Sequence, residues 1–121
     1  MDDAQHKEAE QKAAVERVRT AFPDREVEGI EFDTGRDVLF FVLTSPDRDE
    51  WKKYRGELKK AAGDSDAVES AIERCALAMI RYPERADVAK AFNRRPGLIV
   101  NFAAVLSKIA GVDYEAREKK L

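Results

Sequence analysis

Few side chains in this sequence are of types that perform nucleophilic or acid–base chemistry. The chain contains one histidine, His6, and one cysteine, Cys75. His6 lies in a polar segment where no fixed geometry is expected, so we interpret it as a solvated surface residue. Cys75 falls on an apolar helical stripe, and a thiol without exposure and an activating base is inert. The sequence therefore favours a protein that is not an enzyme.

Metal and cofactor chemistry is equally weakly represented. One histidine and one cysteine far apart would leave a zinc site dependent on carboxylates, and no pair has metal-ligand spacing. Asp64-Ser65-Asp66 begins like a calcium loop but lacks the later glycine and glutamate, which favours a helix cap. No phosphate-binding glycine loop or nucleophile elbow is present. We expect no metal, no cofactor and no small-molecule substrate.

The charge pattern argues against nucleic acid and membrane partners. Charged residues make up 38% of the chain, yet the net charge is only −2 because both signs are interspersed. Short basic pairs such as Arg94-Arg95 are flanked by acids, whereas phosphate binding needs several cations on one face. The longest apolar runs, Val38 to Leu43 and Cys75 to Ile80, are far shorter than the ~20 residues of a membrane span. We expect a soluble, cytoplasmic protein.

The first third of the chain predicts a helix followed by a β-hairpin. Residues 1–22 are rich in helix formers with a thin apolar stripe, and form a predicted N-terminal helical arm. Residues 26–44 predict a hairpin, because Ile30 and Phe32 alternate with charges, Asp33 to Arg36 provides a turn, and an apolar strand follows. Val27 is out of phase with Ile30, which leaves a bulge at Glu28-Gly29 as one of two possibilities.

The remainder predicts a helical bundle over residues 46–111 and a charged tail over 112–121. Ser45 as N-cap with Pro46 starts the first helix, which Gly63 ends. Asp64 or Ser65 caps a central helix running to Tyr82, a short helix spans about Glu84 to Asn93, and a last one runs from Leu98 to Gly111. The chain thus predicts one domain, residues 1–121. Its class is α+β, mainly α: an N-terminal helix, one β-hairpin and a bundle of about four helices.

The second strand carries large apolar side chains on both faces. Val38, Phe40 and Val42 lie on one face, and Leu39, Phe41 and Leu43 lie on the other. The helical bundle covers one face. The other needs the N-terminal helix, another copy of the chain or a different protein, and the sequence leaves these alternatives open.

This order of features resembles the tail assembly chaperone family of long-tailed bacteriophages and prophages. The resemblance covers roughly residues 38 to 112. It rests on Phe40-Phe41-Val42-Leu43 leading into Ser45 to Tyr54, then on Tyr82-Pro83, Arg95-Pro96-Gly97-Leu98 and Ile109-Ala110-Gly111-Val112. It implies a mostly helical protein that binds the tape measure protein, assists recruitment of the tail tube protein, and is absent from the finished virion. A homo-oligomer is a further possibility, because a hairpin can pair with a neighbouring copy.

The predicted partner-binding residues are Phe41 and Leu43 on the spare face of the strand, with Trp51 and Tyr54 just after it. Packing in the core is the alternative role for each. The alternative function is a small phage or bacterial regulator, such as an anti-defence protein, that acts by binding one protein target.

Overall fold

A computed structural model describes residues 2–121 and confirms the predicted class, mainly α with a small β part. The part described contains five helices and one three-stranded antiparallel sheet. In chain order the elements are α1 (Asp3–Ala21), β1 (Val27–Asp33), β2 (Val38–Thr44), α2 (Arg48–Lys60), α3 (Ser65–Met79), β3 (Ile80–Tyr82), α4 (Arg85–Arg94) and α5 (Gly97–Ile109).

The sheet has the order β1-β2-β3, with β2 in the centre. The β1–β2 pairing runs unbroken from Val27↔Thr44 to Asp33↔Val38. The bulge considered at Glu28-Gly29 is therefore absent, and the irregular register lies instead between β2 and β3, at Val42/Leu43. The regular pairing keeps Val27 on the same face as Gly29, opposite to Ile30, so its phase needs no extra residue.

β3 is a strand that the sequence did not predict. Helical spacing continues through Tyr82, but α3 ends at Met79 and the next three residues form β3, in which Ile80 and Tyr82 pair with β2. The Nε of Arg81 also donates a hydrogen bond to the Thr44 hydroxyl at 3.0 Å. The free edge of β2 thus supplies backbone partners that end the helix early, which is a tertiary effect invisible in local periodicity.

The first helix of the bundle begins two residues later than predicted. Ser45 still belongs to the hairpin, because its backbone N–H donates to the carbonyl of Glu26 at 2.8 Å. Asp47 is the N-cap, and it forms a capping box with Glu50. Arg25 donates to Glu50 at 2.6 Å and lies 3.5 Å from Asp47, so it fastens the loop after α1 to the start of α2.

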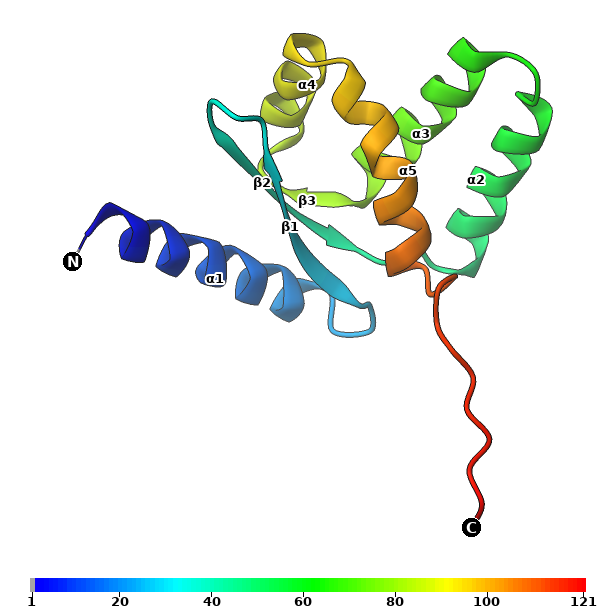
Figure 1. The fold of residues 1–121 in the computed structure, drawn as a ribbon, viewed down its shortest axis with the longest axis horizontal. Helices are drawn as coiled ribbons and strands as arrows, with labels where there is room; N and C mark the ends of the chain where they lie inside the picture. Colours follow the sequence, from blue (N-terminus) through cyan, green and yellow to red (C-terminus); the bar gives the residue numbers. More distant parts are fainter. Residues whose placement is uncertain (1) are drawn as a thin grey trace.

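Two apolar clusters lie on opposite faces of the sheet. The larger one joins Phe41 and Leu43 to residues of α2, α3, α4 and α5. The Phe102 ring of α5 contacts the rings of Phe41, at 5.3 Å, and Phe32, at 5.2 Å. The smaller one joins Val42 to α1. Figure 1 shows the resulting layers, with α1 on one side of the sheet and α3, α4 and α5 on the other.

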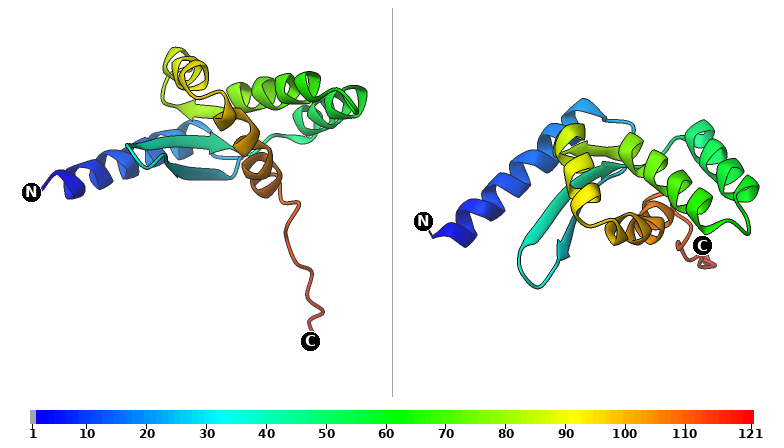
Figure 2. Two further views of the ribbon diagram at one scale, coloured as in Figure 1. Left: turned by 45° about the horizontal axis from the view of Figure 1, so that its top comes forward. Right: turned by 90° about the horizontal axis from the view of Figure 1, so that it is seen from above.

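Both ends of the described chain extend away from these layers. Residues 2–10 are exposed, and Figure 2 shows that this first part of α1 reaches beyond the sheet in both views. After the turn at 110–113 the tail is extended and exposed. Among the helices of residues 2–121, none combines the length and apolar composition needed to cross a bilayer.

Candidate functional site

The structure places the predicted partner-binding residues mainly in the core. Phe41 and Leu43 are 2% and 0% exposed, and Tyr54 is 4% exposed. Trp51 is half-buried and packs against the same cluster, with its ring 5.5 Å from that of Tyr54. Since the helical bundle covers these side chains, they do not form the uncovered face of the strand in this conformation.

The hairpin register explains which face of the strand meets the bundle. Residues directly opposite in an antiparallel pair share a face, and the pairs Ile30↔Phe41 and Phe32↔Leu39 therefore put four large apolar side chains together. The other face has Gly29, Glu31 and Asp33 on β1 instead. The alternation of Ile30 and Phe32 with charged residues indicates that one face of β1 is apolar. Which residues of β2 share that face depends on the register of the hairpin, and the register depends on the position of the turn.

The second face of the sheet is the candidate site, and we call it the α1-covered face. It consists of Val27, Phe40, Val42 and Tyr82. α1 covers it with Ala14, Val15 and Val18, and Phe22, the residue that follows the helix, packs against the same cluster. Val42 is fully buried, while Val27, Phe40 and Tyr82 are half-buried. The choice left open by the sequence is thus resolved within this chain, because its own N-terminal helix covers the face.

Gly29 allows close packing at one side of this face. A Cβ atom at position 29 would lie 2.8 Å from the Phe40 ring and 3.3 Å from a methyl group of Val15. The Phe40 ring therefore occupies the space that a side chain at 29 would take. An open hollow of about 630 Å³ adjoins it, lined by α1 residues from Glu8 to Arg19 and by Gly29 and Phe40.

Two arginines border the opposite side of α1. The guanidinium of Arg81 lies 4.2 Å from the centroid of the Phe22 ring, and that of Arg17 lies 5.9 Å from the Tyr82 ring. Burial, then the nearby charge of Arg25, lowers the pKa of Arg81. These cation–π contacts flank a second hollow of about 620 Å³ between α1 and the β3–α4 segment. Both edges of α1 are accordingly open to solvent.

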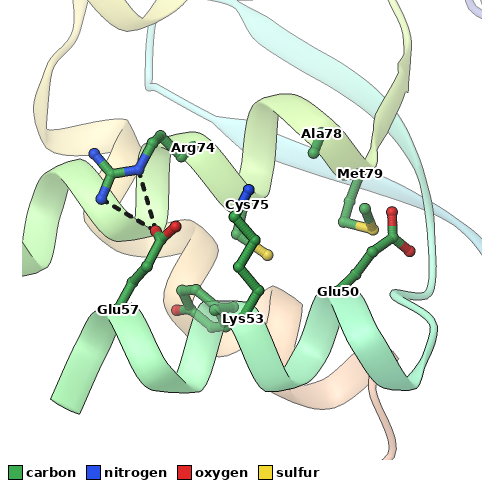
Figure 3. A pocket seen from close by; sticks show the side chains of 8 residues that line it. Glu50, Lys53, Glu57, Arg74, Cys75, Ala78 and Met79 are labelled. Carbon is green, nitrogen blue, oxygen red and sulfur yellow. Dashed lines mark hydrogen bonds and ion pairs between the residues drawn. The ribbon is translucent and has the colours of Figure 1, made fainter. Parts of the chain in front are cut away.

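A smaller hollow of about 170 Å³ lies between α2 and α3 and contains Cys75 (Figure 3). Burial, with smaller effects from Glu50 and Glu57, raises the pKa of the Cys75 thiol to about 12. The thiol is therefore protonated near neutral pH, which is the poorly nucleophilic form. Arg74 bridges the rim through ion pairing with Glu57 at 3.1 Å.

The other residues considered for chemistry are not assembled into a common site. His6 lies on the exposed part of α1, where its Nε2 is 3.2 Å from Glu10. Asp64 caps α3 by accepting hydrogen bonds from the backbone of Asp66 and Ala67. Across residues 2–121, no three histidine, cysteine, aspartate or glutamate side chains gather closely enough to hold a metal ion.

Comparison with known proteins gives a fold relationship. No family model matches the chain, and no curated protein matches it significantly. The structure is similar to that of the uncharacterised protein rbstp2171 from Bacillus stearothermophilus, with a TM-score of 0.64 and 18% sequence identity. The match covers 86% of this chain and 98% of the other. At this identity the two chains share a fold.

Proposed function

We propose that this protein is a non-catalytic assembly factor of the tail assembly chaperone type, which receives an amphipathic helix of its partner on the α1-covered face. The partner helix takes the place of α1. In the unbound protein α1 keeps the apolar face out of water, which limits self-aggregation.

The observation that carries this proposal is the mismatch between α1 and the surface that it covers. α1 contains no leucine, isoleucine, methionine or phenylalanine, and its buried residues are Ala14 and Val18. Phe22, which follows the helix, adds one aromatic ring at its end. The surface beneath includes the larger side chains of Phe40 and Tyr82, both still half-exposed. A small-residue helix thus covers an aromatic surface incompletely.

A helix with larger apolar residues at positions i, i+3, i+4 and i+7 would cover the same surface more fully. Burial of apolar area contributes roughly 25 cal/mol per Å², so replacing alanine and valine by leucine favours exchange of the helices. The resemblance to tail assembly chaperones supports a tape measure protein as the partner, because such a chain is long and helix-forming with exposed apolar stripes. The tail tube protein is the second partner implied by that resemblance.

Coexpression with a tape measure protein, followed by pull-down, tests the proposal. Phe40→Asp replaces a large apolar side chain of the α1-covered face by a carboxylate and should abolish capture, because an apolar stripe of the partner would have to remove that charge from water. Val18→Asp weakens α1 docking while leaving the sheet surface intact, and should increase capture. Val100→Asp, at an exposed position of α5 far from this face, is the matched control and should capture like the unmodified protein.

Circular dichroism confirms that each variant is folded before its capture is compared. Full capture by folded Phe40→Asp would move the binding site elsewhere. Equal capture by Val18→Asp and the unmodified chain would contradict displacement of α1, although not binding itself.

A further inference from the structure

The outer edge of β1 is an unpaired strand edge. Hydrogen bonds from Ser45 N–H to Glu26 C=O, at 2.8 Å, and from Thr34 N–H to Asp37 C=O, at 3.0 Å, mark hydrogen-bonded pairs at the two ends of the hairpin. Pairing alternates, so the even-numbered residues of β1 bond to β2 and the odd-numbered ones direct N–H and C=O away from it. These outward residues are Val27, Gly29, Glu31 and Asp33.

No backbone hydrogen bond of these four outward residues reaches any other element of residues 2–121. Gly29, Glu31 and Asp33 are exposed as well. A strand of seven residues with a free row of donors and acceptors is a template for another extended segment.

The chemistry of this edge selects a basic segment. Glu31 and Asp33 are two residues apart and share the face that α1 covers. Glu31 accepts a hydrogen bond from the Gln11 amide at 2.8 Å, and Asp33 accepts one from the Gly35 N–H at 2.8 Å. Neither carboxylate has a cationic partner in the described chain. An added strand with cationic side chains two residues apart could form ion pairs with both carboxylates.

The tail of this chain has that pattern. Arg117 and Lys119 are two residues apart, are exposed, and form no salt bridge with another part of residues 2–121. Residues 112–121 can extend over about 33 Å, whereas β1 needs about 24 Å. The tail runs away from the sheet of its own chain, as Figures 1 and 2 show, and does not pair with the β1 edge of that chain.

We propose that residues 115–121 of one copy add to β1 of a second copy as a fourth, antiparallel strand. In this register Arg117 lies opposite Asp33, Lys119 opposite Glu31, and Leu121 opposite Gly29. Leu121 then covers the hollow beside the Phe40 ring. A shift by one residue would bring Glu118 onto the acidic face, and a shift by two would lose one of the two ion pairs, so charge selects the register.

Pairing of two β1 edges with each other is a less favourable alternative. It would bring the Glu31 and Asp33 carboxylates of both copies onto one surface without any cation between them, and like charges on neighbouring strands repel. The basic tail removes this repulsion. The ion pairs and backbone pairing of this register involve β1 and the tail, so the tail exchange can be tested apart from partner binding at the α1-covered face.

Charge reversal in the full-length chain tests the tail exchange. One variant carries Arg117→Glu and Lys119→Glu, and the other carries Glu31→Lys and Asp33→Lys. Each alone has a tail and an edge of the same sign and should not self-associate. Mixed in equal amounts, they present opposite signs in both directions and should associate again. A control with Lys52→Glu and Lys90→Glu makes the same charge change at two exposed helix positions as the tail variant does.

Light scattering gives the molar mass across protein and salt concentrations. The unmodified chain and the control should exceed the 13.7 kDa of one chain at low salt and approach it as salt screens the ion pairs. Both reversed variants should remain at one chain, and their mixture should regain the higher mass. Hydrogen exchange should show slower exchange of the Gly29, Glu31 and Asp33 amides in the assembly.

Three outcomes would overturn the proposal. The first is an unmodified chain that stays monomeric at every concentration. The second is self-association that both charge reversals leave unchanged. The third is protection of the Gly29, Glu31 and Asp33 amides in a monomer, which would assign the edge to the tail of the same molecule.

Discussion

The absence of a side chain at Gly29 leaves room for the Phe40 ring of β2 and for the Val15 side chain of α1. A Cβ atom there would approach the Phe40 ring to 2.8 Å and Val15 to 3.3 Å, so the ring or α1 must move. The atoms that must shift are at the far end of the Phe40 side chain, beside an open hollow, so we expect Gly29→Ala to lower the free energy of unfolding by about 1 kcal/mol, the lower end of the usual cost of overpacking. Urea unfolding followed by circular dichroism measures this change.

Gly56 provides the opposite case within the same chain. It lies inside α2, and a Cβ atom added there meets nothing within 4 Å. Gly56→Ala should raise the free energy of unfolding by about 0.5–1 kcal/mol, because alanine has the higher helix propensity. If both substitutions shift stability in the same direction, close packing at Gly29 is not what constrains that position.

Burial of the Cys75 thiol makes the free energy of unfolding depend on pH in the alkaline range. Burial raises its pKa from 9.0 to about 12, so the unfolded chain releases this proton at lower pH than the folded one. The contribution to stability is complete below about pH 9 and is lost as the pH rises from about 9 toward 12. Tyr54, whose pKa burial raises from 10.0 to about 12, acts in the same direction over the upper part of this range.

Unfolding in urea at pH 7, 9, 10 and 11 tests this coupling. The free energy of unfolding should fall above pH 9 in the unmodified protein and fall less steeply in Cys75→Ala. Tyr54→Phe should remove part of the decline above pH 10. The slopes are compared rather than the absolute stabilities, because both substitutions also change packing. Identical slopes in all three proteins would contradict burial of these groups.

The beginning of α2 depends on a small set of polar contacts. The carboxylate of Asp47 accepts the backbone N–H of Glu50 at 2.8 Å, while the Glu50 carboxylate accepts that of Asp47 at 2.9 Å. Asp47→Ala removes the cap together with the 3.5 Å contact to Arg25, and we expect a loss of about 1 kcal/mol in the free energy of unfolding. Asp49→Ala is the matched control, since Asp49 is exposed in the same turn and its carboxylate makes no hydrogen bond within residues 2–121.

Differential scanning calorimetry of the two variants separates the cap from the effect of charge near a helix end. Asp49→Ala should change stability by less than about 0.5 kcal/mol. A cost for Asp49→Ala as large as that for Asp47→Ala would show that charge, and not the capping box, dominates here.

The elements that were predicted correctly are those marked by residues within the element itself or directly beside it. The central helix, its cap at Asp64 and the hairpin follow from apolar spacing, cap residues and turn residues. β3 was missed because Ile80 to Tyr82 keeps helical spacing, and only the free edge of β2 converts it to a strand. The cap moved from Ser45 to Asp47 for a related reason, since hairpin pairing extends to Ser45.

The candidate site was predicted only in part. The sequence identified β2 as a strand with two apolar faces, but the face predicted to be spare, that of Phe41 and Leu43, is the one that the bundle covers. Register decides this, because Ile30 and Phe32 join Phe41 and Leu43 on one side. Phe40 and Val42 are left for α1, so the residues predicted for partner binding and those on the candidate site alternate along the same strand.

The molecule as a whole consists of a large apolar cluster and a small one that share a sheet. The large cluster joins four helices to one face, and the Phe102 ring makes edge-on or tilted contacts with the rings of Phe32, Phe41 and Phe92. The small cluster contains three fully buried residues, Ala14, Val18 and Val42. Because apolar burial dominates stability, detaching α1 from one face of the sheet should need a different free energy from opening the bundle on the other face.

Native-state hydrogen exchange measures this difference directly. The amides of α1 should exchange through an opening that needs less free energy than the opening of α3 and α5, even without denaturant. Val18→Ala removes about 1.5 kcal/mol of apolar burial, which should accelerate α1 exchange about tenfold. If the amides from Ala14 to Ala21 instead open together with those around Phe102, α1 belongs to the cooperative core. A partner helix could then displace it only by unfolding the protein, and the α1-covered face would no longer be a credible binding site.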